Sequence, residues 1–241
     1  MDPTTLRGEP ILPHAVRARL NGSAWALVLL VTIELATNFL SDDVRASGLM
    51  GGGQTMPHRS IADAVWLGMM VTLLLGTTIL WLANQVERLS KAILLCTGVF
   101  TAQLLVATVL VVLRLVQGWK VAVATLILDA LIIFVTNVLI FALWYWLLDA
   151  EDPRAPSATA ETRWHLLFPQ RQSDFPGYAG WRPHFLDYLY VAYTTSVAFS
   201  PTDTLPLSRA AKMLMMTQSI IALITITVVA GTAINLLANN A

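Results

Sequence analysis

Five runs of mostly apolar residues, each long enough to cross a bilayer as a helix, dominate this chain of 241 residues. A spanning helix needs about 20 such residues, because each adds about 1.5 Å toward a hydrocarbon core about 30 Å thick. The runs cover residues 24–40, 61–82, 92–116, 121–148 and 210–237. Backbone polar groups in lipid must pair within their own segment, so we expect each run to form a helix.

The composition agrees with a membrane fold. Apolar residues make up 56% of the chain and charged residues 12%, about half the charged fraction of an average soluble domain. A soluble fold of this size could not bury so much apolar surface. The formal net charge is zero, so no basic surface indicates a nucleic-acid partner. The sequence therefore predicts an all-α, multi-pass protein of the cell membrane, with the lipid bilayer as its surroundings.

The chain divides into two parts. Residues 1–120 hold an N-terminal tail and three predicted transmembrane helices, and residues 121–241 hold a second, pore-like module. The short links 84–91 and 117–120 predict antiparallel neighbouring helices. The proline-rich linker 149–183 reads as a loop lying on the bilayer, where aromatic side chains are favoured. Its aromatic residues are Trp164, Phe168, Phe175, Tyr178 and Trp181.

Residues 184–200 are apolar but too few to span a membrane comfortably. Pro183 precedes this segment, where proline is tolerated at a helix start, and Pro201 follows it. Ser208 is suited to be the N-cap of the last helix. The predicted order is a short helix, an irregular strand, a turn and a long inner helix, which is the order of a re-entrant loop. Five spanning helices and one re-entrant helix complete the expected fold.

This order resembles the pore module of tetrameric potassium channels, in which an outer helix, a pore helix, a filter strand and an inner helix follow one another. The filter of that family reads T-x-T-V-G-Y-G-D, and Asp203 follows the matching frame here two positions late. The residues in the frame are Thr194, Thr195, Ser196, Val197, Ala198, Phe199 and Ser200. The same stretch also resembles an uncharacterised family of bacterial integral membrane proteins, a resemblance that implies no activity.

The frame departs from the potassium filter at both glycines, which are replaced by Ala198 and Ser200. A residue with a Cβ atom costs about 1–2 kcal/mol in the left-handed backbone that those positions require. A potassium filter in its usual geometry is therefore not expected. A wider constriction, lined by Thr195, Ser196 and neighbouring carbonyl groups, fits the sequence better.

A polar stripe follows the last predicted helix at a spacing of seven residues, through Gln218, Thr225 and Thr232. Such a stripe on an inner helix can line a conduit for ions. The same residue types also hydrogen-bond between helices and allow them to pack closely. Beside a re-entrant segment the two interpretations have equal weight.

Glu34 and Asp129 are the two acids near the middle of predicted spans. An acid at that depth is costly, so each is a candidate for a function in proton or cation passage. The alternative is a buried acid that fixes helix packing through Gln103 or Asn137. The histidines have no metal-ligand spacing, and no catalytic group has an evident partner. We therefore expect no metal, no cofactor and no enzymatic activity.

These features favour an oligomeric, channel-like protein, with a tetramer as the preferred assembly, that passes a small cation such as K+ or Na+. One alternative is a non-conducting membrane scaffold that binds a partner or lipid. The other is a small proton-coupled transporter that uses Glu34 and Asp129. The side that holds the long linker carries 11 of the 15 lysines and arginines. The positive-inside rule places that side in the cytoplasm, opposite to the potassium-channel orientation.

Overall fold

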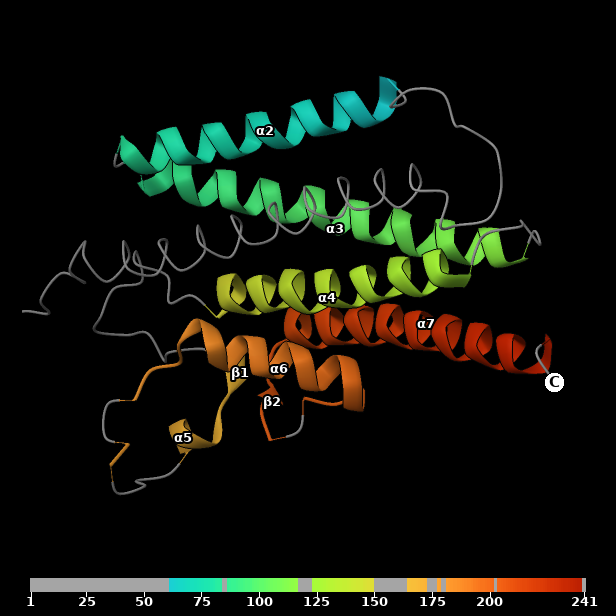
Figure 1. Ribbon diagram of the computed structural model, residues 1–241. Coiled ribbons are helices and arrows are strands. Elements are labelled where there is room, and N and C mark those ends of the chain that lie inside the picture. The colour runs from blue at the N-terminus through green and yellow to red at the C-terminus, as the bar shows by residue number, and fades with distance from the viewer. Residues whose placement is uncertain are drawn as a thin grey trace, which may run out of the picture.

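The computed structural model describes residues 61–83, 86–116, 123–149, 164–172, 177–178, 181–201 and 203–239. They form six helices and two short strands (Figure 1). The elements are α2 (Ile61–Leu82), α3 (Val86–Val116), α4 (Val123–Leu148), β1 (Leu166–Leu167), α5 (Pro169–Gln172), α6 (Phe185–Ala198), β2 (Leu205–Pro206) and α7 (Arg209–Asn239). The predicted helix at residues 24–40 lies outside the described residues.

Three of these helices contain segments long and apolar enough to cross a membrane: Lys91–Leu113, Ile127–Leu148 and Arg209–Thr232. This confirms the predicted helical class for three of the five runs, as helices that could span a membrane by length and composition. The run at residues 61–82 is helical over its predicted bounds as α2, in which Val71–Leu82 is a shorter apolar segment. Its role as a fourth span stays a prediction.

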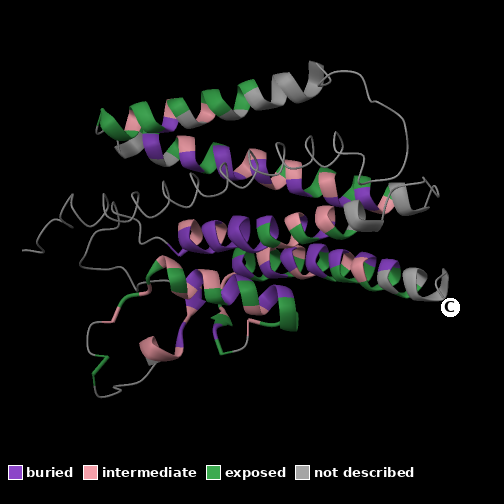
Figure 2. Cartoon of the chain, in the orientation of Figure 1, coloured by how far each residue is buried: buried purple, intermediate pink, exposed green. Residues whose placement is uncertain are grey.

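Helix α4 is the centre of the structure. It packs against α3, α6 and α7, whereas α2 packs mainly against α3 (Figure 1). Nearly every residue in the second half of α4 is buried, and α2 is exposed over most of its described residues (Figure 2). The half of α4 that precedes Asp149 is therefore the part to which the other elements are fixed.

Helix α6 begins at the same end of the molecule as strand β2, which follows it in the chain. Strand β1 lies just beyond the end of α4, and β2 pairs with it antiparallel, with Leu166 opposite Pro206 and Leu167 opposite Leu205. The Leu207 amide also donates to the His165 carbonyl, at 2.9 Å. Helix α7 starts two residues later at Arg209. The chain between the two strands thus leaves this end along α6 and returns to it.

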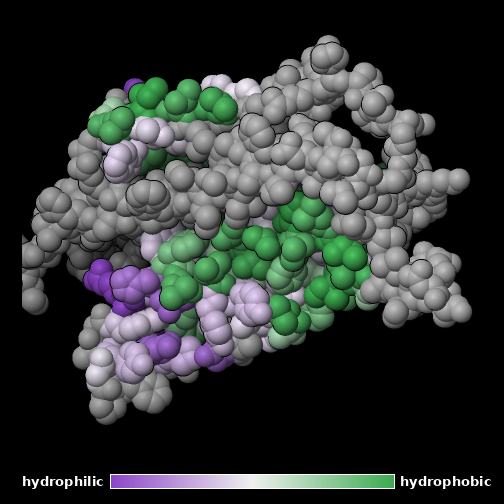
Figure 3. Space-filling model, in the orientation of Figure 1, coloured by the Kyte–Doolittle hydropathy of each residue, from purple (hydrophilic) through white to green (hydrophobic). Residues whose placement is uncertain are grey.

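The outer surface of the long helices is apolar. On the face shown in Figure 3, the coloured residues over the region of α4 and α7 are mostly hydrophobic, and hydrophilic residues gather at the end where α5 lies and α6 begins. Large apolar side chains are exposed along α3, α4 and α7, for example Leu95, Leu131 and Ile220. A surface of this kind suits lipid rather than water.

Candidate functional site at the junction of α4, α6 and α7

The segment that aligns with a potassium filter is helical here. Helix α6 continues through Thr194 to Ala198, so the extended strand expected at residues 194–200 is wrong. Thr194 donates its hydroxyl to the Tyr190 and Val191 carbonyls of the same helix, both at 3.0 Å. These bonds use the backbone as a helix does, and no row of carbonyls points to one side as a filter would need.

The left-handed residue of this segment is Phe199, the C-cap of α6, with φ 53° and ψ 26°. Ala198 and Ser200, which stand at the two glycine positions of the potassium filter, do not have positive φ angles. Phenylalanine is rarely found in this conformation, which costs about 1–2 kcal/mol for a residue with a Cβ atom. Strain of this kind at a non-glycine residue often marks a functional position.

Glycine at position 199 should make the protein more stable than alanine does. Phe199→Ala and Phe199→Gly both remove a ring that is 46% exposed, but only glycine relieves the left-handed strain. We expect the free energy of unfolding of the Phe199→Gly variant to be about 1 kcal/mol higher than that of Phe199→Ala. Denaturant titration in detergent micelles measures both. Equal stabilities would mean that residue 199 is not held in the left-handed region.

Gln218 of α7 joins α7 to both α4 and α6. Its side chain is fully buried. The amide Nε2 donates to the Ala192 carbonyl at 2.7 Å and to Ser196 Oγ at 2.9 Å, both on α6. The amide Oε1 accepts from the Tyr145 hydroxyl of α4 at 2.5 Å. One side chain therefore holds three helices together in a region where no water competes for its bonds.

Asn137 of α4 completes this polar network from the other side. Its Nδ2 lies 3.4 Å from Ser196 Oγ and 3.4 Å from the Gln218 carbonyl. Ser196 and Asn137 are fully buried, and Thr195 is 1% exposed and lies against the Tyr145 hydroxyl. Thr195 and Ser196 thus face the interior of the protomer. These two side chains can position the end of α6, but they do not line an opening on the surface of the protein.

The polar stripe on α7 faces the same interior. Thr225 and Thr232 are 4% and 5% exposed. Each donates its hydroxyl to a carbonyl four residues earlier in α7, that of Ile221 or Val228. The prediction that Gln218, Thr225 and Thr232 face a conduit is therefore not supported. The structure agrees with the second interpretation of this stripe, because its members bond within the bundle and pack there.

A second buried cluster forms around Asp149 at the end of α4. Its Oδ1 accepts from the His165 and Leu166 amides, at 3.1 and 3.2 Å. Its Oδ2 accepts from the Arg171 guanidinium at 2.9 Å and from the Tyr188 hydroxyl at 2.7 Å. The side chain of Asp149 is 1% exposed and that of Arg171 is 10% exposed. This carboxylate fixes β1, α5 and the start of α6 to α4.

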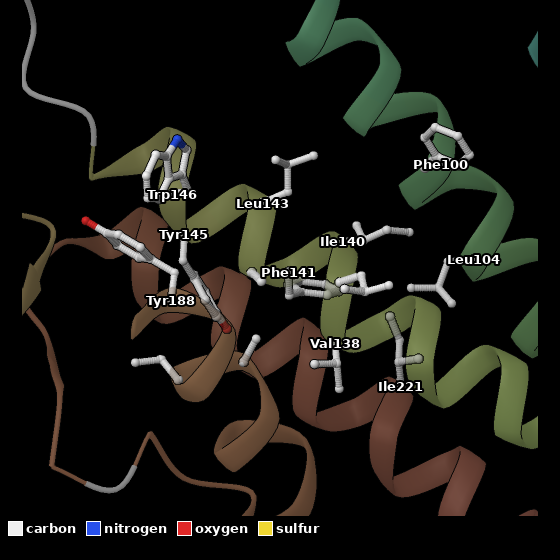
Figure 4. Packing of buried hydrophobic residues seen from close by; sticks show 14 of the residues in the cluster. Phe100, Leu104, Val138, Ile140, Phe141, Leu143, Tyr145, Trp146, Tyr188 and Ile221 are labelled. Carbon is white, nitrogen blue, oxygen red and sulfur yellow. The ribbon is translucent and has the colours of Figure 1, made fainter. Parts of the chain in front are cut away.

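Aromatic rings close this cluster. Tyr188 makes edge-to-face contacts with Trp146 and Phe168, each with ring centroids 5.4 Å apart; Figure 4 shows Tyr188 beside Trp146. Trp181 packs on Phe168 at 5.6 Å. Phe168 is 4% exposed, so the prediction that it lies at the bilayer surface is wrong. Here the linker aromatics pack on the protein, whereas Tyr178 is exposed and Phe175 lies outside the described residues.

The exposed part of the predicted filter is the tip of α6. Val197, Ala198, Phe199 and Ser200 are all exposed, and Asp203 is exposed on the returning turn. Asp203 has an interaction with another group of the chain. The structure therefore divides the predicted filter residues into the partly buried Thr194, a buried pair, Thr195 and Ser196, and an exposed tip that follows them.

Of the two acids predicted to lie within the membrane, the structure describes Asp129. Asp129 lies in α4, partly buried, and interacts with another group of the chain. Glu34 lies outside the described residues. Asn137, one of the two partners expected for these acids, donates to Ser196 and Gln218 instead. A function for the acids stays a prediction.

Sequence reasoning missed several residues of the two networks, among them Tyr145, Asp149 and Tyr188. Tyr145 lies between two tryptophans near a helix end, a pattern typical of an interfacial aromatic belt. Asp149 follows a long apolar helix, where an acid normally marks the boundary with water. One feature of the sequence could have indicated that Tyr188 is buried: it lies one turn inside a short helix that cannot span the membrane.

Comparisons with known proteins give no further identity, since no protein family, no curated protein and no solved structure matches this chain. The part of the chain that the structure describes defines the class: a helical protein in which three helices could cross a membrane, with a short helix fixed between two of them.

Proposed function

We propose that this chain forms an oligomeric membrane protein that passes a small cation past the exposed tip of α6. The observation that carries the proposal is the return of the chain after α6 to the end from which it left, through the pairing of β1 with β2. A helix of 14 residues rises about 21 Å, less than the hydrocarbon core of about 30 Å. In a membrane, α6 is then a re-entrant helix between α4 and α7.

The tip has the electrostatics that a cation requires. The last carbonyl groups of a helix carry a partial negative charge, and α6 has no basic residue in its last turn. The tip residues are exposed on the outside of the protomer, so a single copy cannot enclose an ion there. Several copies with their tips facing a common axis would form the constriction, as the resemblance to tetrameric potassium channels implies.

The buried networks give the tip a fixed position. Gln218 holds the Ala192 and Ser196 turn of α6 against α7, and Asp149 holds Tyr188, two turns earlier, against α4. A helix fixed at both points presents the same residues in every copy. Thr195 and Ser196 then act by positioning the tip, and Val197 to Ser200 form the narrow part of the path.

The test is cation flux from liposomes that hold the purified protein, with K+, Na+ and H+ compared. Flux above that of empty liposomes is expected for at least one alkali cation. Ala198→Trp places a bulky ring on the exposed tip and should reduce the flux at least tenfold. Leu186→Trp, at the 71% exposed start of the same helix, is the matched control and should leave it within twofold.

Three results would contradict the proposal. Absence of flux for all three ions, over a range of pH and voltage, would favour the non-conducting scaffold. Flux that is unchanged by Ala198→Trp would place the path elsewhere. A flux that needs a pH gradient and is lost in Asp129→Asn would favour the proton-coupled transporter.

A further inference from the structure

The outer face of α7 can be followed from Arg209 to Ile234, the part of the helix whose exposure the structure describes. At 100° per residue, ten of the twelve exposed residues fall within a sector of about 100°, with Ala210 and Ile226 to either side of it and the buried Gln218 opposite. The face contains Arg209, Lys212, Met213, Met216, Ile220, Leu223, Thr227, Ala230, Gly231 and Ile234, all exposed. Its charged residues are confined to the first turn, and the rest of the face is almost entirely apolar.

The two cations on this face have no partner among the described residues. The side chains of Arg209 and Lys212 make no hydrogen bond or ion pair with any of them. Asp149, a carboxylate at the same end of the molecule, is bonded to Arg171 instead. The two residues are three positions apart, so their Cβ atoms are neighbours on the helix surface, about 5–6 Å apart. Both can therefore reach a single anionic group.

Their position opposes the helix dipole. Cations are unfavourable near a helix N-terminus, where the backbone carries a partial positive charge. Ser208 already caps α7 by accepting from the Ala211 amide at 3.1 Å, so the cations are not needed to end or begin the helix. An anion bound beside them would be favoured by both side chains and by the dipole.

The apolar part of the face has the length of one lipid leaflet. From Lys212 to Leu223 the helix rises about 17 Å, close to half of a hydrocarbon core about 30 Å thick. An acyl chain whose headgroup lies at Arg209 and Lys212 would run over Met213, Met216 and Ile220, which are 60%, 58% and 56% exposed. The charge at one end and the apolar stripe beyond it complement a phospholipid with a negative headgroup.

We propose that this face of α7 is a binding site for an anionic phospholipid, with its phosphate on Arg209 and Lys212 and an acyl chain along Met213 to Leu223. The site is independent of the proposed conduit. The exposed face of α6 and that of α7 each lie opposite the side that contacts the shared junction, so the two surfaces point in different directions.

The test compares phosphatidylglycerol with phosphatidylcholine of the same acyl chains. Each is titrated onto the full-length chain in detergent, and bound lipid is counted by native mass spectrometry. Phosphatidylglycerol should bind at least tenfold more tightly. A cation near an anionic lipid is worth about fivefold in affinity, so Arg209→Gln with Lys212→Gln should weaken phosphatidylglycerol binding by roughly 25-fold and leave phosphatidylcholine unchanged.

Two controls separate this site from general charge and from misfolding. Arg182→Gln removes another exposed arginine without an ion pair to the described residues, just before α6, and should leave the affinity within twofold. Exchanging the two side chains, Arg209→Lys with Lys212→Arg, should keep it within threefold. Equal affinity for the two lipids overturns the proposal, as does full phosphatidylglycerol binding by the double glutamine variant. A loss of binding in Arg182→Gln as large as in that variant would also overturn it.

Discussion

Replacing Gln218 with leucine is expected to lower the free energy of unfolding by about 2–3 kcal/mol, the largest effect of any single change in the polar network around Gln218. The substitution removes two donors to α6 and the acceptor of the Tyr145 hydroxyl. A buried polar group left without a partner costs about 1–3 kcal/mol, although a typical hydrogen bond between membrane helices contributes only about 0.6 kcal/mol. Most of the loss should therefore come from the groups left unpaired.

Thr225→Val is the matched control for this prediction. Thr225 lies on the same buried stripe, but its hydroxyl bonds only within α7, so we expect a change below about 0.5 kcal/mol. Adding Tyr145→Phe to Gln218→Leu removes the hydroxyl that has lost its acceptor, and should restore about 1 kcal/mol of the free energy of unfolding. Unfolding in mixed detergent micelles measures all of these variants. A Gln218→Leu effect no larger than that of Thr225→Val would mean that the junction is held by packing alone.

Asp149→Asn should destabilise the protein by about 2–4 kcal/mol. The amide can still accept from the His165 and Leu166 amides, but it presents a donor to Arg171 and Tyr188. Removing one member of a buried ion pair costs about 3–5 kcal/mol, because the other charge stays buried. We place the estimate lower because Arg171 retains some contact with water. Thermal unfolding in detergent measures the change.

The control for Asp149 is an acid whose carboxylate accepts a backbone amide at the start of a helix. Asp187 accepts from the His184 amide at 2.6 Å at the exposed start of α6, and Asp187→Asn should cost about 0.5–1 kcal/mol. Combining Asp149→Asn with Arg171→Gln should recover at least half of the loss, because no buried charge is then left alone. If Asp149→Asn proves as mild as Asp187→Asn, the cluster does not fix α6 to α4.

The sequence predicted the helices well because their cause is local. A run of apolar residues of sufficient length forms a helix wherever backbone groups must pair within their own segment. The bounds of α2 and the end of α4 agree with prediction to the residue. The start of α6 after Pro183 and the cap of α7 by Ser208 are also correct, since prolines and caps act on neighbouring residues.

The sequence failed where the outcome depends on what a side chain meets. The residue types of Gln218, Thr195 and Ser196 are those of a pore lining. Only packing against α4 places these side chains in the interior. The resemblance to a filter predicted an extended strand at residues 194–198, but hydrogen bonds within α6 keep them helical. Phe168 is an aromatic residue in the linker, which is typical of a residue at the membrane surface, but contacts with Tyr188 and Trp181 bury it.

By itself the sequence determined that this chain is helical, with runs long and apolar enough to cross a membrane and a short helix before the last long one. Hydrophobic length, prolines and caps suffice for that, because each acts over a few residues or against the bilayer as a whole. Only the tertiary structure decided which polar residues are buried. Asp149 and Arg171 are 22 positions apart, and Tyr145 and Gln218 are 73 apart. No local pattern encodes such pairs, which form only when the helices meet.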